Sequence, residues 1–405
     1  MSAKLFLILM TVVAVITDSM LHPFYPQYLA KVFGVVDPQH AGFYIGACSL
    51  TVMLSFPAWA LLSRRVHVLQ LLVATQIATG LLSVACCATT SLAWFWVVSL
   101  CMMVFKASYL LIYPYVMSLE AKEHHVRTIG LLAFVVYFGN ILAALLSGVV
   151  FELLDPRLLF VAMAFGDVLQ ILLCLRLLKA PASAPEEAQS DAAAAGPLPT
   201  LPRYFVYRLG LVMLVVYFSA YLTEPFFSSY WESVSAVDNK IITGLVFAIP
   251  GVAALLGLYA NAKRRSDASA PYAGILPAIV VGVCSLWLQA AGVPLALLIG
   301  RFLYGWALFQ SMVRLDSLLF RFSTPETYSV DFSKLNLFQG LGVLFASLAA
   351  GSLVSWLGSR ATFIVSAGGF LAGALLYWGL FRSELWPRRT AALEPASVRT
   401  GEVST

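Results

Sequence analysis

Long runs of apolar residues dominate the chain, and short polar segments separate them. A run of about 20 apolar residues forms a helix long enough to cross a lipid bilayer. By that measure the sequence predicts twelve spanning helices, over residues 5–32, 41–62, 68–88, 93–117, 128–151, 158–178, 205–231, 241–262, 272–291, 294–320, 334–357 and 361–382. The runs lack the alternation of a transmembrane β-barrel. The expected fold is therefore an all-α membrane protein.

Composition supports this interpretation and excludes other classes. Hydrophobic residues make up 60% of the chain and charged residues 11%, whereas soluble domains carry about 25% charged residues. The net charge of +5 is small, so we expect no nucleic-acid partner. All six cysteines fall inside predicted spans, where we expect free thiols and no metal site. Because no nucleotide-binding loop, Ser/His/Asp arrangement or zinc motif occurs, we expect neither an enzyme nor a cofactor.

The basic residues predict the orientation. If the N-terminus is inside, most Lys and Arg side chains lie at the inner ends of the spans. Five lie at the outer ends, namely Lys31, Arg157, Lys240, Arg301 and Arg360. Basic residues favour the cytoplasmic side of a membrane. We therefore expect both termini in the cytoplasm and a location in a bacterial inner membrane.

A segment rich in Ala, Pro and acidic residues, over 179–203, interrupts the apolar pattern. Such a composition cannot build a core and is typical of a flexible linker. We expect it to separate two six-helix bundles, over 1–178 and 204–383, with a disordered cytoplasmic tail over 384–405.

The two predicted bundles repeat each other. The sequence HPFYPQY at 22–28 matches EPFFSSY at 224–230, an offset of 202 residues, and Gly42 matches Gly244 at the same offset. At an offset of 203, Gly139, Gly148, Arg157 and Phe160 match Gly342, Gly351, Arg360 and Phe363. A near-constant offset indicates duplication of a six-helix unit in one orientation.

Twelve spans, a long central loop and two parallel repeats resemble the major facilitator superfamily. The family's loop signature is partly kept: the basic pairs Arg64-Arg65 and Arg264-Arg265 are present, while Ser63 and Asn261 stand where the family has Asp. The resemblance implies a secondary transporter whose first, fourth, seventh and tenth helices line a central cavity. It also implies that the basic pairs contribute to a cytoplasmic gate.

Charged side chains inside spans are the main candidates for function, because each costs about 2.5–3.5 kcal/mol at the bilayer centre. Asp18, Lys106, Glu224, Arg314 and Asp316 fall on the four helices that the resemblance places at the cavity. Asp167, in the sixth span, is an exception for which the sequence suggests no role.

Each of these charges shares a helical face with polar or aromatic residues. The four stripes are Asp18, His22 and Tyr25; Lys106, Tyr109 and Tyr113; Tyr217, Tyr221, Glu224 and Ser228; and Gln310, Arg314 and Ser317. Aromatic surface with a few polar groups suits a small organic ligand. We therefore expect Lys106, Arg314, Tyr25, Tyr109, Tyr113, Tyr217, Tyr221 and Gln310 to bind substrate.

Two hypotheses assign the charges. In the first, Asp18 or Glu224 carries a coupling proton, since burial favours the protonated carboxyl and an approaching cation favours the ionised one. His22 would be a second titrating group. The alternative is a structural ion pair, for example between Asp18 and Lys106.

In the second hypothesis, Lys106 and Arg314 hold an anionic substrate group from opposite halves. The alternative is that acidic neighbours, namely Asp18, Asp316 or Glu120, neutralise the two cations.

Prolines suggest where the helices bend. Pro23 and Pro225 occupy equivalent positions in the two halves, and proline removes a backbone hydrogen bond and kinks a helix. We expect these kinks near an outer gate, with Arg64, Arg65, Arg264 and Arg265 at the cytoplasmic side. The alternative for the prolines is a static kink that fits the packing.

The sequence thus predicts a proton-coupled exporter of a small, partly anionic metabolite or drug-like compound, with a carboxylate siderophore as one case. Its partners would be substrate, protons and membrane lipids, and we expect a monomer. One alternative is an importer of an organic acid or sugar. Another is a non-transporting membrane receptor or assembly factor.

Overall fold

The computed structural model describes residues 3–112, 115–116, 125–179, 204–263, 274–322 and 328–385. The predicted site residues Tyr113, Arg264 and Arg265 lie outside these ranges, as do nearly all of the predicted linker and the tail beyond residue 385. The helices are α1 (Ala3–Ser19), η1 (His22–Phe24), α2 (Tyr25–Phe33), α3 (Pro38–Leu62), α4 (Val68–Ala88), α5 (Leu92–Lys106), η2 (Ala107–Leu111), α7 (His125–Leu153), α8 (Leu158–Lys179), α9 (Phe205–Leu222), α10 (Phe227–Ser235), α11 (Lys240–Lys263), α12 (Ile275–Ala290), α13 (Pro294–Phe322), α14 (Tyr328–Leu357) and α15 (Ser359–Leu385).

The predicted all-α, twelve-helix membrane fold is confirmed. Over the described ranges, eleven helical segments are long and apolar enough to cross a membrane, and α12 is a shorter apolar helix that completes the set. The start of the second predicted span differs from the prediction because of local capping. The third helix begins at Pro38 and not at 41, because Asp37 caps it: its carboxylate accepts a hydrogen bond from the Gln39 amide at 3.0 Å.

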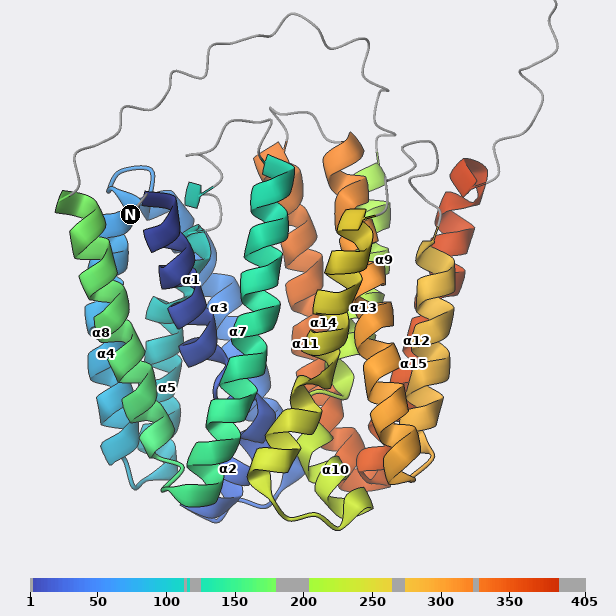
Figure 1. The fold of residues 1–405 in the computed structure, drawn as a ribbon, viewed down its shortest axis with the longest axis horizontal. Helices are drawn as coiled ribbons and strands as arrows, with labels where there is room; N and C mark the ends of the chain where they lie inside the picture. Colours follow the sequence, from blue (N-terminus) through green and yellow to red (C-terminus); the bar gives the residue numbers. More distant parts are fainter. Residues whose placement is uncertain are drawn as a thin grey trace, which may run out of the picture.

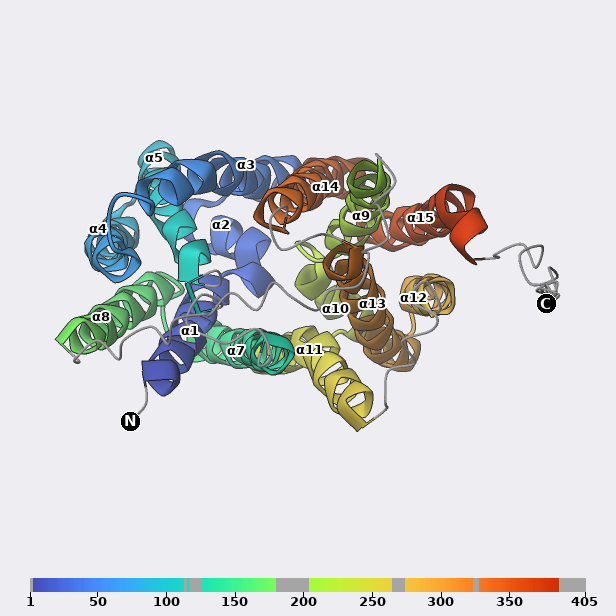
Figure 2. The same cartoon turned by 90° about the horizontal axis from the view of Figure 1, so that it is seen from above.

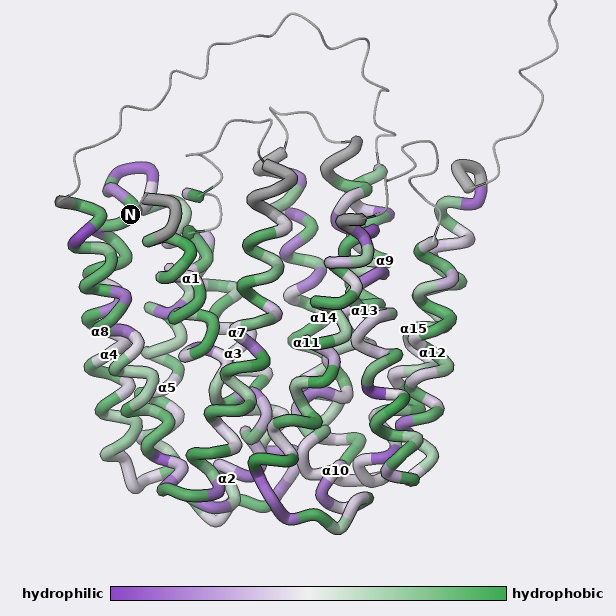
Figure 3. Tube along the Cα trace, in the orientation of Figure 1, coloured by the Kyte–Doolittle hydropathy of each residue, from purple (hydrophilic) through white to green (hydrophobic). Residues whose placement is uncertain are grey.

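The helices form two groups, α1–α8 and α9–α15, which lie side by side (Figure 2). The described chain begins and ends on one side of the molecule, here called the N-terminal face, and α2 and α10 lie on the other side, here called the opposite face (Figure 1). Apolar residues predominate along the helices in Figure 3. Exposed apolar side chains such as Leu54, Leu81 and Trp94 give the surface the character that a lipid environment requires.

The first and seventh spans are interrupted at matching positions. In the first, α1 ends at Ser19 and a short 3-10 turn containing Pro23 leads into α2. In the seventh, α9 ends at Leu222 and α10 starts at Phe227, with Pro225 between them. Proline cannot donate the helical hydrogen bond, and its ring displaces the preceding turn. The predicted kinks are therefore present, 202 residues apart.

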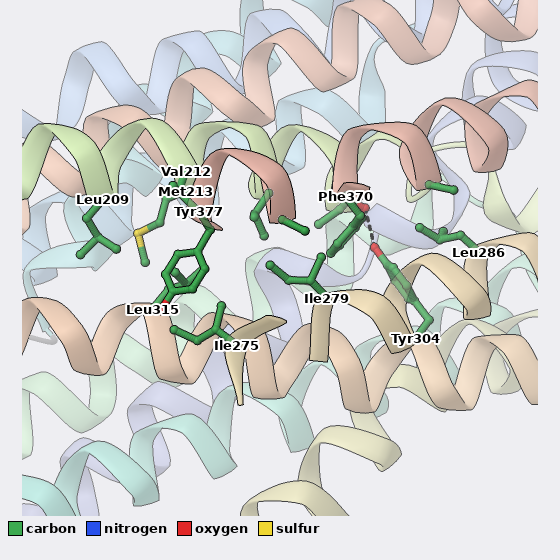
Figure 4. Close-up of a cluster of buried hydrophobic side chains, with 14 of the residues drawn as sticks. Leu209, Val212, Met213, Ile275, Ile279, Leu286, Tyr304, Leu315, Phe370 and Tyr377 are labelled. Carbon is green, nitrogen blue, oxygen red and sulfur yellow. Dashed lines mark hydrogen bonds between the residues drawn. The ribbon is translucent and has the colours of Figure 1, made fainter. Parts of the chain in front are cut away.

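Side chains from neighbouring helices occupy the carbonyl groups that these breaks release. The Tyr304 hydroxyl donates a hydrogen bond to the Ala220 carbonyl oxygen at 2.9 Å (dashed line in Figure 4). In the first half, the Ser147 hydroxyl contacts the Met20 carbonyl oxygen in the same way. An unpaired carbonyl in a dry interior costs free energy, so these contacts hold both breaks in place.

Apolar packing fills the interior of each half. In the second half, Ile275, Ile279 and Leu286 of α12 are fully buried and pack towards α13 and α15 (Figure 4). This packing ties α12 to α13 and α15 within the second half.

Glycines let the two halves approach closely near the opposite face. A Cβ added to Gly42 of α3 would lie 2.9 Å from the Cα atom of Gly351 in α14, and one added to Gly244 of α11 would lie 3.6 Å from the Cα atom of Gly148 in α7. These four glycines are among those that match across the sequence repeat. Two symmetry-related crossings, α3 with α14 and α7 with α11, therefore close the opposite face, because only small residues permit such contact between helix backbones.

Gly42→Ala should destabilise this closed arrangement. The new methyl group would lie 2.8 Å from the Ser347 carbonyl oxygen, and overpacking of this kind costs about 1–3 kcal/mol. We expect a lower thermal unfolding midpoint in detergent micelles. Gly379→Ala is the matched control, because its Cβ meets nothing within 4 Å. Equal midpoints for the two variants would contradict the role of the crossing.

Candidate functional site

A cavity of about 730 Å³ lies between the two halves. Residues from α1, η1, η2 and α7 line it on one side, and residues from α9, α11 and α13 line it on the other. Its volume falls within the range of about 300–1,000 Å³ that is typical of sites for small organic ligands.

Eight of the fourteen predicted site residues that the structure describes meet at this cavity. Asp18, His22, Pro23, Lys106, Tyr109, Tyr217, Tyr221 and Glu224 all line it. Tyr25, Pro225, Gln310 and Arg314 are absent from its lining. Arg64 and Arg65 lie on an exposed turn after α3 and are also absent from the lining.

Asp18 and Lys106 form an ion pair that joins α1 to the end of α5. The Lys106 side chain is 7% exposed and that of Asp18 is 29% exposed, so the carboxylate is the member that faces the cavity more. Removing one partner of a buried pair leaves the other charge uncompensated. The structural ion pair that the sequence left open as an alternative is thus present in this conformation.

Glu224 stands in a different environment, inside the break between α9 and α10. Within the described residues it makes no ion pair and no side-chain hydrogen bond. Arg301 is close enough to interact with it electrostatically, but the two do not form a salt bridge. In the second half, Glu224 and Arg301 therefore face the cavity as two separate charged groups.

Arg301 is a functional candidate that the sequence analysis placed at the outer end of its helix. The structure adds that Arg301, near the start of α13, is buried: it is 3% exposed and lines the cavity. Its guanidinium carbon lies 3.6 Å from the centre of the Phe227 ring, and one terminal nitrogen donates to the Phe247 carbonyl oxygen at 3.4 Å. Its Nε atom is buried without a partner, so one donor remains free for a ligand.

The face of α13 that meets the cavity also differs from the predicted one. The cavity-lining residues of this helix are Arg301, Tyr304, Gly305, Leu308, Phe309 and Met312. At about 100° per residue, Gln310 lies about 180° from Arg301. The helical spacing of Arg301, Tyr304, Leu308 and Met312 could have identified this cavity-facing side of α13 from the sequence.

Gln310 and Arg314 are engaged within the second half. Gln310 and Asn261 exchange amide hydrogen bonds of 3.0 and 3.2 Å, which tie α13 to α11. The Arg314 guanidinium packs against Gly274 at the start of α12. Asp316 accepts a hydrogen bond from Gln339 at 3.3 Å. The cation that Arg314 was expected to supply at the cavity is therefore supplied by Arg301.

Aromatic rings make up much of the remaining wall. Tyr217 and Tyr221 stack with their centroids 6.0 Å apart and their planes 15° apart. Tyr137 of the first half meets Phe309 of the second edge to face at 5.6 Å. Tyr25 instead packs against Tyr44 at 5.7 Å in the core of the first half. The cavity thus offers ring surfaces together with both signs of charge, which suits an amphipathic organic molecule.

Curated relatives match part of the chain. The multidrug resistance protein MdtG of Escherichia coli O9:H4 is 26% identical over 186 residues, which are 45% of this chain and 46% of the relative. MdtG of Salmonella paratyphi B is 27% identical over 192 residues, 47% of this chain and 46% of the relative. The chain thus matches about half the length of these curated relatives.

Solved structures share the whole fold. The human organic anion transporter MFSD10 superposes with a TM-score of 0.71 at 17% identity, over 93% of this chain and 98% of its own. The POT family transporter PepTSo gives 0.74 at 10% identity, over 94% and 98%. A bacterial homologue of the lysosomal transporter Spinster gives 0.71 at 14% identity in its inward-facing, occupied form, over 94% and 96%. At these identities the likeness shows the fold alone.

The family model described as Major Facilitator Superfamily matches residues 7–291. Together with the twelve apolar helices and the fold shared with the structural neighbours, this match identifies an integral, multi-pass membrane protein. The chain belongs to the Major Facilitator Superfamily.

Proposed function

We propose that this carrier exports drug-sized, partly anionic organic compounds in exchange for protons. It would lie in a bacterial inner membrane with its N-terminal face towards the cytoplasm, as the basic residues of the sequence suggest. The partial match to multidrug resistance proteins and the aromatic cavity of about 730 Å³ support a drug-like substrate. A carboxylate siderophore is one compound of this kind.

Transport would proceed by alternating access between two bundles. The glycine crossings at Gly42–Gly351 and Gly148–Gly244 close the opposite face in this conformation. For release, the halves would separate at these crossings and close towards the N-terminal face. The breaks at Pro23 and Pro225 lie at the side that has to open, which supports a role for these segments in the outer gate.

Glu224 carries the proposal for proton coupling. It faces the cavity without a salt bridge, next to Arg301 and Tyr221. A carboxyl in a partly dry site changes its charge when a cation or a proton arrives. The ionised form would hold a cationic group of the substrate while Arg301 holds the anionic one, and protonation of Glu224 would remove that attraction. Proton and substrate would thus exclude each other at one carboxyl group, as exchange requires.

Arg301 would recognise the anionic group. Its buried Nε donor has no partner in the protein, and its guanidinium is stacked on Phe227, which fixes the plane of the fork. Arginine binds carboxylates through two parallel hydrogen bonds. Lys106, already paired with Asp18, is less available for the same task.

Glu224→Gln should abolish proton-driven transport. The assay is uptake of a radiolabelled quinolone carboxylic acid into proteoliposomes with an imposed inside-acidic pH gradient, in which passive weak-acid distribution opposes accumulation. We expect flux at the level of protein-free liposomes, because an amide cannot exchange a proton. Glu224→Asp, which keeps a titratable carboxyl, should retain part of the flux.

Asp238→Asn is the matched control for that assay. Asp238 is exposed, and its hydrogen bond from Lys240 holds the pKa of the carboxyl below its usual range, so it stays ionised during turnover. Its flux should equal that of the unmodified protein. Unchanged proton-driven flux in Glu224→Gln would refute the coupling role.

Arg301→Gln should impair recognition of the acid but not of its neutral methyl ester. A hydrogen bond to a charged group contributes about 1.5–3 kcal/mol, so the KM for the acid should rise about 10- to 100-fold. Arg314→Gln, outside the cavity lining, is the matched control and should leave both KM values unchanged. An equal loss for acid and ester in Arg301→Gln would argue for a structural role instead.

A further inference from the structure

Asp167 of α8 is a buried acid that transport through the cavity does not by itself explain. It is 1% exposed, and neither of its carboxylate oxygens has a hydrogen-bond partner. The neighbouring Thr79 of α4 directs its hydroxyl to the Gln76 carbonyl and amide oxygens, at 3.0 and 3.1 Å. Gly80 of the same helix also lies beside Asp167, since a Cβ added to it would lie 3.6 Å from the Asp167 Cβ.

Such surroundings favour the protonated acid. An ionised carboxylate that has neither water nor donors loses its solvation without compensation. Among the described residues the cation that acts on Asp167 is Lys106, and in this conformation Lys106 is held by Asp18. The group formed by Asp18, Lys106 and a protonated Asp167 is then electrically neutral, which is the state that a low-dielectric interior favours.

The packing brings the two acids to the same lysine. Helices α1 and α8 touch where Thr17 meets Gly166, so closely that a side chain at 166 would clash. The next residue on each helix is an acid, Asp18 on α1 and Asp167 on α8. The charges of both acids act on Lys106. One buried lysine is therefore within electrostatic reach of two carboxyl groups, one facing the cavity and one enclosed.

The fold does not require an acid at this position. The equivalent crossing in the second half joins α9 to α15 at Ser219 and Gly369, which are Thr17 and Gly166 shifted by 202 and 203 residues. There the following residues are Ala220 and Phe370, both buried and apolar. The same helix crossing is thus stable with a phenylalanine in place of Asp167, so packing alone gives no reason for a carboxyl group.

We propose that Asp167 is an enclosed proton store that exchanges its proton with Asp18 through Lys106. The Lys106 ammonium gives a proton to the Asp18 carboxylate: one N–H bond breaks and an O–H bond forms. The resulting amine takes the proton of Asp167, so that the O–H bond of Asp167 breaks and the N–H bond is restored. The products are a neutral Asp18, facing the cavity, and an ion pair of Lys106 with Asp167.

Other titratable groups border this relay. They are His22 and Tyr109, which interact with Asp18, and Cys86, which interacts with Lys106. None of these is a second cation fixed beside Asp167. The backbone next to Lys106 is also irregular, since α5 gives way to the 3-10 turn η2 at Ala107. A 3-10 turn within a helix often marks a hinge. Here the turn follows Lys106, the residue that has to change partners.

The role of the relay in transport rests on the proposed proton coupling, but its test needs neither a substrate nor flux. Infrared spectra of the full chain in lipid nanodiscs at neutral pH report the carbonyl stretch of protonated carboxyl groups. The difference between unmodified protein and Asp167→Asn isolates the band of Asp167. The same difference is then measured in an Asp18→Asn background. A loss of coupling in Glu224→Gln would leave this result unaffected, so the two proposals fail separately.

We expect the Asp167 band in the first difference and its loss in the second. Without the Asp18 carboxylate, Lys106 pairs with Asp167, which gives up its proton. Adding Lys106→Met to the Asp18→Asn background should restore the band, because no cation remains to ionise Asp167. A band in both differences would overturn the proposal, since Lys106 would not change partners. Absence of the band from the first difference would overturn it as well.

Two further variants keep the test decisive. If Asp167→Asn does not yield monodisperse protein, Asp167→Leu provides the same difference spectrum. It places an apolar side chain at a position where the second half also has one. Glu224→Gln is the matched acid control, because Glu224 interacts with Arg301 and not with Lys106. The Asp167 band should persist in that background, and its disappearance there would contradict the specific link to Asp18.

Discussion

The cost of placing charge in a lipid bilayer constrains the whole molecule. The outer surfaces of the helices carry apolar side chains, and the charged groups of the spans have to find partners or a cavity. The described structure meets this constraint by turning Asp18, Lys106, Glu224 and Arg301 towards a single space between the halves. Gathered there, they form both the site that can hold a polar substrate group and the set of groups that can exchange a proton.

The two halves meet the constraint differently, although they share one fold. In the first half Asp18 and Lys106 are paired, and a second acid, Asp167, lies behind them. In the second half Glu224 and Arg301 face the cavity without a salt bridge between them. Duplication explains the common framework of broken helices and glycine crossings, while divergence at a few positions supplied distinct charges. An asymmetric site of this kind can bind the substrate in a single orientation and the proton at a separate position.

The sequence was sufficient for the parts of the fold that depend on local pattern. Apolar length predicted the spans, and the repeat identified Gly42, Gly148, Gly244 and Gly351, which turned out to touch each other across the halves. The prolines marked the breaks. These features follow from the length of the apolar runs and from the sterics of glycine and proline, which can be read directly from one sequence.

The candidate site was harder to predict because it depends on how each helix is rotated. Polarity alone favoured the face of α13 that carries Gln310 and Arg314, yet that face packs against α11 and α12. Arg301 was counted among the cations at the outer ends of the spans, but cation–π contact with Phe227 allows it to be buried at the cavity. Asp167 had no interpretation without the α1–α8 contact. Pairings of this kind arise only from tertiary packing.

In the proposed transport cycle the halves separate at the opposite face, and the protonation state of Glu224 controls that separation. Double electron–electron resonance between spin labels at Val36→Cys and Asp238→Cys, exposed positions on either half, measures this directly in lipid nanodiscs with the native cysteines replaced. The account predicts a short and a long distance whose proportions change with pH, and no such change when Glu224→Gln is added. A single distance at every pH, or the same pH response in the variant, would contradict it.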